Sequence, residues 1–157
     1  MSAMMNDRFA ALSRDDNPIH CDPVFAEFLQ TYGQAALKCE DPNHIERLGR
    51  LFWFTVEFGL IREHGETKLY GSGLISSLGE SFHALESPDV DRRPFDMDRV
   101  CDTPFEIDHY QPILYVLDSF EQLADAMNHI GRMSRRKSSA KKKTSSRSRR
   151  IKDASIL

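Results

Sequence analysis

One carboxylate lies inside the most aromatic stretch of this 157-residue sequence. Glu57 falls within Leu51–Leu60, which reads Leu-Phe-Trp-Phe-Thr-Val-Glu-Phe-Gly-Leu. Because an ionised carboxylate is costly to bury alone, Glu57 must be neutral, ion-paired, metal-bound or solvent-facing. Together with two histidines it would form the 2-His-1-carboxylate triad of a non-haem Fe(II) oxygenase. Arg50 lies on the same helical stripe, so a local ion pair or an exposed side chain also remains an open interpretation.

A glycine- and serine-rich bend follows this stretch. Residues 70–77 read Tyr-Gly-Ser-Gly-Leu-Ile-Ser-Ser. Glycine lets the backbone approach a ligand closely, and serine hydroxyls can donate hydrogen bonds to it. The same letters suit a strand-to-helix turn in which a serine caps the helix, so both interpretations stay open. The sequence contains no dinucleotide fingerprint, phosphate loop, GxSxG elbow or HExxH motif.

The histidines and cysteines form no recognisable metal motif. The six histidines are scattered without metal-ligand spacing, and we interpret each as a surface or capping residue: His20, His44, His64, His83, His109 and His129. The three cysteines include no CxxC pair, so we expect neither a disulfide framework nor a thiolate metal site: Cys21, Cys39 and Cys101.

Helical periodicity predicts the elements that must position these groups. Asp-Pro pairs at 22–23 and 41–42 are helix start signals, and apolar side chains follow at helical spacing over residues 22–37 and 42–58. A turn at His64-Gly65 predicts a hairpin between strands 60–62 and 67–70. The other expected elements are a helix over 74–85, a charged loop over 89–94, strands over 105–107 and 113–117, and a last helix capped by Ser119.

Composition indicates a globular body with a basic tail. The chain is 40% hydrophobic and 29% charged, and no apolar run is long enough to span a membrane. The start of the chain lacks the layout of a secretory signal, so we expect a cytoplasmic protein. Residues 132–157 hold eleven of the 21 Lys and Arg residues and one acid, a net charge of +10. We expect this tail to be disordered, and residues 132–152 could bind nucleic acid nonspecifically.

Four segments together resemble the pterin-dependent aromatic amino acid hydroxylases, most closely the bacterial-type phenylalanine 4-monooxygenases. They are Pro23–Ala26 with Gln30–Gly33, Phe52–Leu60, Tyr70–Ser77 with Glu80, and Tyr115–Phe120. The resemblance runs from about Pro18 to about Met127. It implies a mainly α fold with short β strands, corresponding to the C-terminal part of a hydroxylase catalytic domain.

The resemblance also implies a role for five of the matched residues. Glu57 would be the carboxylate ligand of the iron. Trp53 and Phe58 would wall the pocket for the aromatic substrate, while Gly73 and Ser76 would lie beside the bound amino acid and the metal shell. Family chemistry uses Fe(II), tetrahydrobiopterin and O2 to hydroxylate the ring of an aromatic amino acid such as phenylalanine.

Both iron-binding histidines of the family pattern are missing. The pattern is His-Asp/Glu-x-x-Gly-His shortly before the segment at Pro23, and a gapless alignment puts Ala11 and Asp16 at the two histidine positions. Alanine has no ligand atom, and His20 falls four residues too late. A site with one certain ligand should bind Fe(II) poorly, so we expect little activity from the isolated chain and assign no catalytic residue.

These departures lead to a three-part interpretation of the chain. Residues 1–17 are an unmatched segment, 18–131 a partial hydroxylase domain, and 132–157 the basic serine-rich tail. We expect a truncated or degenerate phenylalanine 4-monooxygenase. A dimer mate or another chain could supply the missing histidines. The alternative is a non-catalytic adaptor or nucleic-acid-binding protein, whose salt-sensitive binding would vanish when residues 132–157 are deleted.

Overall fold

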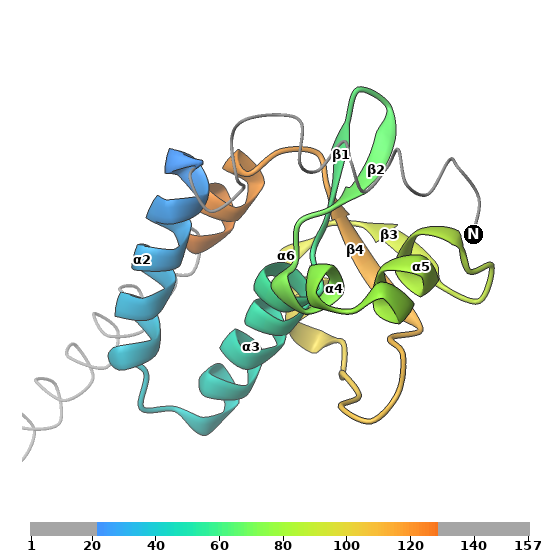
Figure 1. Cartoon of the computed structure of the whole chain (residues 1–157). Coiled ribbons are helices and arrows are strands. Elements are labelled where there is room, and N and C mark those ends of the chain that lie inside the picture. Colours follow the sequence, from blue (N-terminus) through green and yellow to red (C-terminus); the bar gives the residue numbers. More distant parts are fainter. Residues whose placement is uncertain (1–21, 129–157) are drawn as a thin grey trace, which may run out of the picture.

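Helices surround a small four-stranded sheet in the computed structural model, which describes residues 22–128 (Figure 1). The expected mainly α fold with short strands is confirmed. No helix in this described part is long and apolar enough to cross a membrane. The elements in chain order are α2 (Pro23–Leu37), α3 (Pro42–Phe52), the π-helix η2 (Trp53–Glu57), β1 (Leu60–Glu63), β2 (Glu66–Leu69), α4 (Ser72–Ser76), α5 (Leu78–Glu86), β3 (Asp91–Pro94), α6 (Met97–Asp102), β4 (Ile113–Leu117) and a helix over residues 121–128.

The two Asp-Pro pairs begin helices as predicted. Asp22 Oδ1 accepts hydrogen bonds from the backbone amides of Val24 (2.8 Å) and Phe25 (3.1 Å), and so caps α2. Asp41 Oδ1 accepts from Asn43 N at 3.0 Å and caps α3 in the same way. In both helices proline occupies the first turn, where its missing amide costs nothing.

The helix predicted over 42–58 changes type before it ends. α3 stops at Phe52, and the next turn is the π-helix η2. Phe58 N donates to Trp53 O at 2.8 Å, five residues back instead of four. This wider turn rotates the side chains after Phe52 relative to an ideal α-helix, and π turns are frequent at functional sites.

The sheet has the strand order β2-β1-β4-β3. β1 pairs antiparallel with β2 through the predicted hairpin, whose turn residues His64 and Gly65 have φ angles of 53° and 84°. Positive φ at both positions is typical of the two-residue turns that match the twist of a hairpin. β4 pairs in parallel with β1 on one side and with β3 on the other.

Two of the expected elements are wrong, because their backbone groups find partners that the sequence pattern does not reveal. Residues 91–94 form strand β3 instead of lying in a charged loop, since Asp91 aligns with Ile113 in a parallel ladder. Residues 105–107 are not a strand. The buried amide of Gln111 bonds there instead, donating to Glu106 O and accepting from Glu106 N at 3.4 Å.

Two helical assignments also need correction. The single helix expected over 74–85 is two helices, because Ser77 is extended (φ −127°, ψ 115°) and its hydroxyl accepts from Glu80 N at 3.3 Å to cap α5. Helix α6 was not predicted. Its N-cap is Asp96, whose carboxylate accepts from Arg99 N at 2.9 Å.

Two apolar clusters hold these elements together. The larger cluster joins α2, α3 and η2 to the helix at 121–128, so the first and last described elements lie side by side (Figure 1). Its fully buried members include Phe25, Phe28, Leu51, Phe54 and Leu123. The smaller cluster lies between the sheet and the α4–α5 pair and includes Leu60, Leu69, Leu74 and Leu114.

Two buried tyrosines differ in whether their hydroxyl groups are paired. The Tyr70 hydroxyl has no hydrogen-bond partner within residues 22–128, and burial raises the pKa of this phenol far above its ordinary value. The Tyr115 hydroxyl instead bonds Thr103 Oγ1 at 2.7 Å. Tyr70→Phe should therefore leave the free energy of unfolding unchanged or raise it, whereas Tyr115→Phe should lower it by about 1 kcal/mol. Urea unfolding of both variants measures this difference, and equal destabilisation by the two changes would contradict it.

Candidate carboxylate site

The π-helix η2 places Glu57 at the edge of the core. Phe54, Thr55 and Val56 are buried and fix the turn, while the Glu57 side chain is half-buried. The Thr55 hydroxyl donates to Leu51 O at 2.6 Å, so the turn is also held by a polar bond. The carboxylate that the sequence places in an aromatic run thus lies at the boundary between core and solvent.

The glycine- and serine-rich bend closes directly over this carboxylate. Ser72 Oγ donates to Glu57 Oε2 at 3.1 Å. A Cβ atom at Gly71 would lie 2.4 Å from Glu57 O, and one at Gly73 would lie 3.3 Å from Glu57 Oε2. Only glycine at position 71 lets the two backbones approach this closely. The bend and the aromatic run, read separately in the sequence, therefore form one site.

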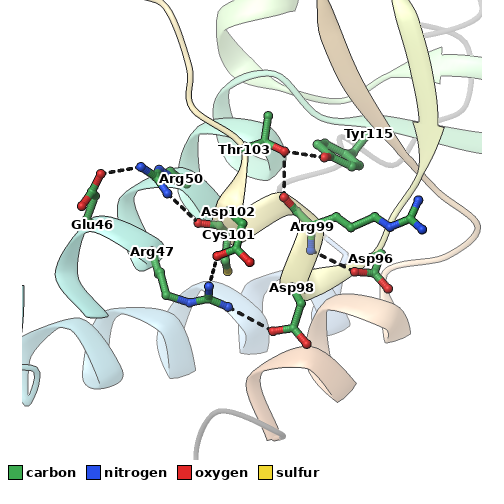
Figure 2. A network of polar contacts seen from close by, with 10 residues as sticks. All are labelled: Glu46, Arg47, Arg50, Asp96, Asp98, Arg99, Cys101, Asp102, Thr103 and Tyr115. Atoms are coloured by element: carbon green, nitrogen blue, oxygen red, sulfur yellow. Dashed lines mark hydrogen bonds and ion pairs between the residues drawn. The ribbon is translucent and has the colours of Figure 1, made fainter. Parts of the chain in front are cut away.

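The local ion pair considered for Glu57 does not form. Figure 2 shows Arg50 bonding the Glu46 carboxylate and the carbonyl of Cys101. Its neighbour Arg47 bridges Asp98 and Asp102, so both arginines tie α3 to α6. Within residues 22–128 no basic side chain forms an ion pair with Glu57, and its bonded neighbour is the Ser72 hydroxyl.

Three aromatic rings stack together at η2, and one of them, Phe58, shares with the Glu57 carboxylate the space beside Gly73. The Trp53 indole stacks on Phe58, with ring centroids 4.8 Å apart, and on Phe105, with centroids 4.4 Å apart. The indole N–H is buried and has no hydrogen-bond partner among the described residues. Phe105 was missed as a site residue because its contact with Trp53 joins segments far apart in the sequence, and no local pattern signals it.

The Phe105 ring, which lies in a loop, should control the solvent exposure of Trp53, the only tryptophan in the chain. Phe105→Ala should expose one indole face, so the fluorescence maximum of Trp53 should move to longer wavelength and acrylamide quenching should increase. We expect the free energy of unfolding to fall by about 1 kcal/mol, because an aromatic pair is lost at a half-buried position. Ile107→Ala is the matched control, since that side chain in the same loop is 78% exposed. An unchanged Trp53 emission in Phe105→Ala would contradict the stacked arrangement.

The structure brings together four of the five residues that the resemblance singles out. Glu57, Phe58 and Trp53 share η2 and its end, and Gly73 packs against the carboxylate. Ser76 lies one turn further along α4, and its hydroxyl donates to Gly73 O at 2.9 Å. Ser76 therefore supports the bend without contacting Glu57. Binding of a metal by Glu57 and of a substrate by the other four stays a prediction.

Within residues 22–128 no group of three His, Cys, Asp or Glu side chains could hold a metal ion. The described histidines near an acid are on the surface, as predicted: His44 pairs with Asp41 (3.4 Å) and His109 with Glu106 (3.6 Å). Cys101 is an unpaired thiol, and burial raises its pKa to about 11, so it is mostly protonated at neutral pH. The expectations for Ala11, Asp16, His20, Cys21, His129 and the basic tail fall outside the described residues.

Comparison with protein families accounts for this arrangement. The family model for the biopterin-dependent aromatic amino acid hydroxylases matches residues 15–154. The chain belongs to this family. The resemblance read from the aromatic run and the bend is therefore confirmed, and Glu57 with its bend lies within the matched region of a hydroxylase-family chain.

Individual hydroxylases match about 70–75% of the chain. Phenylalanine-4-hydroxylase of Ralstonia nicotianae is 46% identical over 109 residues, covering 69% of this chain and 35% of that protein. Tyrosine 3-monooxygenase of Drosophila melanogaster is 44% identical over 119 residues, covering 75% of this chain and 20% of that protein. The chain thus spans about a third or less of the length of these relatives.

Solved structures of a bacterial hydroxylase share the fold. Chromobacterium violaceum phenylalanine hydroxylase with bound Fe(III) superposes with a TM-score of 0.67 at 41% identity, over 69% of this chain and 39% of that one. The same enzyme has been solved with iron(III) and oxidised 7,8-dihydrobiopterin, and with iron and phenylalanine. These structures show what that enzyme binds.

Proposed function

We propose that this chain supplies the carboxylate ligand and the aromatic pocket wall of a phenylalanine 4-monooxygenase-type site. The observation that carries the proposal is the Glu57 carboxylate, which the bend at Gly71–Gly73 holds near the ring of Phe58, on which Trp53 stacks. Phenylalanine-4-hydroxylases are 46–49% identical in two bacteria and tyrosine 3-monooxygenases are 43–44% identical, so we propose an aromatic amino acid as the substrate class and phenylalanine as the first to test. When complete, such a site uses Fe(II), tetrahydrobiopterin and O2 to hydroxylate the aromatic ring.

Residues 22–128 offer one ligand of an iron site and not the complete ligand set. Glu57 offers a half-buried carboxylate with no competing cation, which suits one ligand of Fe(II). The two imidazoles that complete a facial triad are not among the described residues near it. We therefore expect weak iron binding and little hydroxylation by this chain alone, and we derive no reaction step through the metal.

The other side chains act on the substrate ring and on water. Trp53 stacks between Phe58 and Phe105, so the three rings form an apolar surface on which an aromatic side chain could pack. Positioning an aromatic ring and excluding water beside the carboxylate are the contributions that these residues can make.

Chemical rescue with free imidazole tests whether Glu57 is a metal ligand. Co(II), an air-stable substitute for Fe(II), is titrated into the full chain with and without imidazole, and quenching of Trp53 fluorescence is followed. If the Glu57 carboxylate is one metal ligand of the site, imidazole should strengthen Co(II) binding because it supplies the missing nitrogen ligands. Glu57→Gln should weaken the imidazole-dependent binding at least tenfold while leaving the unfolding curve nearly unchanged.

Glu66→Gln provides the control, since that exposed carboxylate lies at the hairpin away from the bend. Equal Co(II) affinity in wild type, Glu57→Gln and Glu66→Gln would overturn the proposed role of Glu57. A direct assay of phenylalanine conversion to tyrosine, with Fe(II) and tetrahydrobiopterin added, tests the expected weakness. Robust turnover by the unassisted chain would show that its ligand set is complete.

A further inference from the structure

Ser72 has one hydroxyl hydrogen and two acceptors within reach. Its Oγ lies 3.1 Å from Glu57 Oε2 and 3.3 Å from Val56 O, both at the end of η2. The shorter contact is to a carboxylate, and hydrogen bonds to charged acceptors are the stronger ones. The hydroxyl therefore faces back toward η2 instead of along its own helix.

The usual structural role of a serine at a helix start does not explain this orientation. Ser72 is the first residue of α4, and no side chain caps that helix. The two neighbouring serines do serve their own helices, because Ser77 caps α5 and Ser76 bonds Gly73 O. Of the bend's three serines, Ser72 alone contacts the carboxylate.

The contacts around the carboxylate distinguish its two oxygens. Oε2 accepts from Ser72, and the backbone at Gly73 packs so closely that a Cβ there would be 3.3 Å away from it. Oε1 has no hydrogen-bond partner within residues 22–128. A glutamate side chain loses considerable rotamer freedom when it is fixed, so a bond that fixes one oxygen decides where the other points.

We propose that Ser72 is a positioning residue, which fixes the Glu57 carboxylate through Oε2 so that Oε1 is the oxygen presented to a metal ion. The metal part of this inference rests on the proposed function. The orienting part rests only on the contacts of the metal-free chain. Because outer partners of a metal ligand set its orientation, their loss weakens metal binding without removing a ligand.

Three variants separate positioning from stability. Ser72→Ala removes the hydroxyl, Ser72→Thr keeps it, and Ser87→Ala removes a hydroxyl that serves a remote turn at Asp89. In the metal-free protein, NMR scalar couplings should report one dominant Glu57 side-chain rotamer for wild type and Ser72→Thr. Ser72→Ala should show rotamer averaging at Glu57, with an unfolding curve close to that of Ser87→Ala. Unchanged Glu57 couplings in Ser72→Ala, or averaging that Ser72→Thr fails to prevent, would overturn the orienting role.

A Co(II) titration in the presence of imidazole tests the metal part. We expect Ser72→Ala to raise the apparent dissociation constant about tenfold, as for other outer partners of metal ligands. For Ser72→Thr and Ser87→Ala the apparent dissociation constant should stay within about twofold of the wild-type value. Ser72→Thr keeps a hydroxyl at position 72, and Ser87→Ala leaves Ser72 unchanged. Altered rotamers with unchanged Co(II) affinity would overturn the metal part. If wild type binds no Co(II) with imidazole, the proposed function fails, whereas the NMR couplings still decide whether Ser72 orients Glu57.

Discussion

Replacing Gly59 by alanine should destabilise the protein by about 3 kcal/mol or more, because the added methyl group meets atoms that cannot yield. A Cβ atom at Gly59 would lie 2.1 Å from Tyr70 Cζ and 2.2 Å from Thr55 O. The Tyr70 ring is buried and contacts Phe25 and Phe120 edge-on, so it has no free direction to move. The carbonyl of Thr55 belongs to η2 and moves only with the turn that carries Glu57.

Gly49→Ala is the matched control for this substitution. Gly49 lies on the exposed side of α3, and a Cβ atom there would meet nothing within 4 Å. Alanine is the better helix former, so Gly49→Ala should raise the free energy of unfolding by about 0.5–1 kcal/mol. Urea unfolding should therefore move the midpoints of the two variants in opposite directions. A Gly59→Ala protein as stable as wild type would show that η2 and the Tyr70 strand end are not in contact.

Local signals account for much of the fold and for the centre of the site. The Asp-Pro pairs fixed the starts of α2 and α3, and the His64-Gly65 pair fixed the hairpin. Glu57 and the bend at 70–77 were both singled out, because a carboxylate among aromatic residues and a glycine cluster are unusual in composition. Each signal is carried by a few neighbouring residues.

Features that depend on partners far along the chain were not predictable in this way. The stacking of Phe105 on Trp53 joins a loop to a helix, and nothing next to Phe105 indicates its partner. The π turn at η2 has the same apolar spacing as the end of an α-helix, so periodicity does not distinguish them. The bond from Ser72 to Glu57 likewise appears only once the bend folds over η2.

Strand β3 was likewise not predictable from local sequence, here because most of its residues are charged. The run at 91–94 contains Asp, Arg, Arg and Pro, a composition typical of a loop. It is a strand because β4 pairs with it and because Arg92 turns its guanidinium inward to the end of α5. The charge that suggests solvent exposure is satisfied by backbone carbonyls instead.

Arg92→Met should lower the free energy of unfolding by about 3 kcal/mol, since hydrogen bonds to a charged group contribute more than neutral ones. The Arg92 guanidinium donates to the carbonyls of Ala84 (2.6 Å), His83 (3.3 Å) and Ser87 (3.0 Å). These carbonyls lie at the C-terminal end of α5, where helix carbonyls lack partners within the helix and a cation is favourable. Methionine keeps much of the side-chain volume but leaves the carbonyls without this donor.

Arg93→Met, one residue further along the same strand, separates this bonding from loss of charge. Arg93 is half-buried, pairs with Asp91 and also hydrogen-bonds Tyr115, but it contacts none of the α5 carbonyls that Arg92 binds, and an ion pair this close to solvent contributes little to stability. Both variants remove one positive charge from β3, but only Arg92→Met also removes the hydrogen bonds to the α5 carbonyls. We therefore expect only Arg92→Met to shift the urea midpoint and to speed amide exchange in the last turn of α5. A similar shift in both variants would mean that the net charge of the strand matters more than the carbonyl contacts. Because α5 packs on α4, which carries the bend over Glu57, loosening its end should also weaken the imidazole-dependent binding of Co(II).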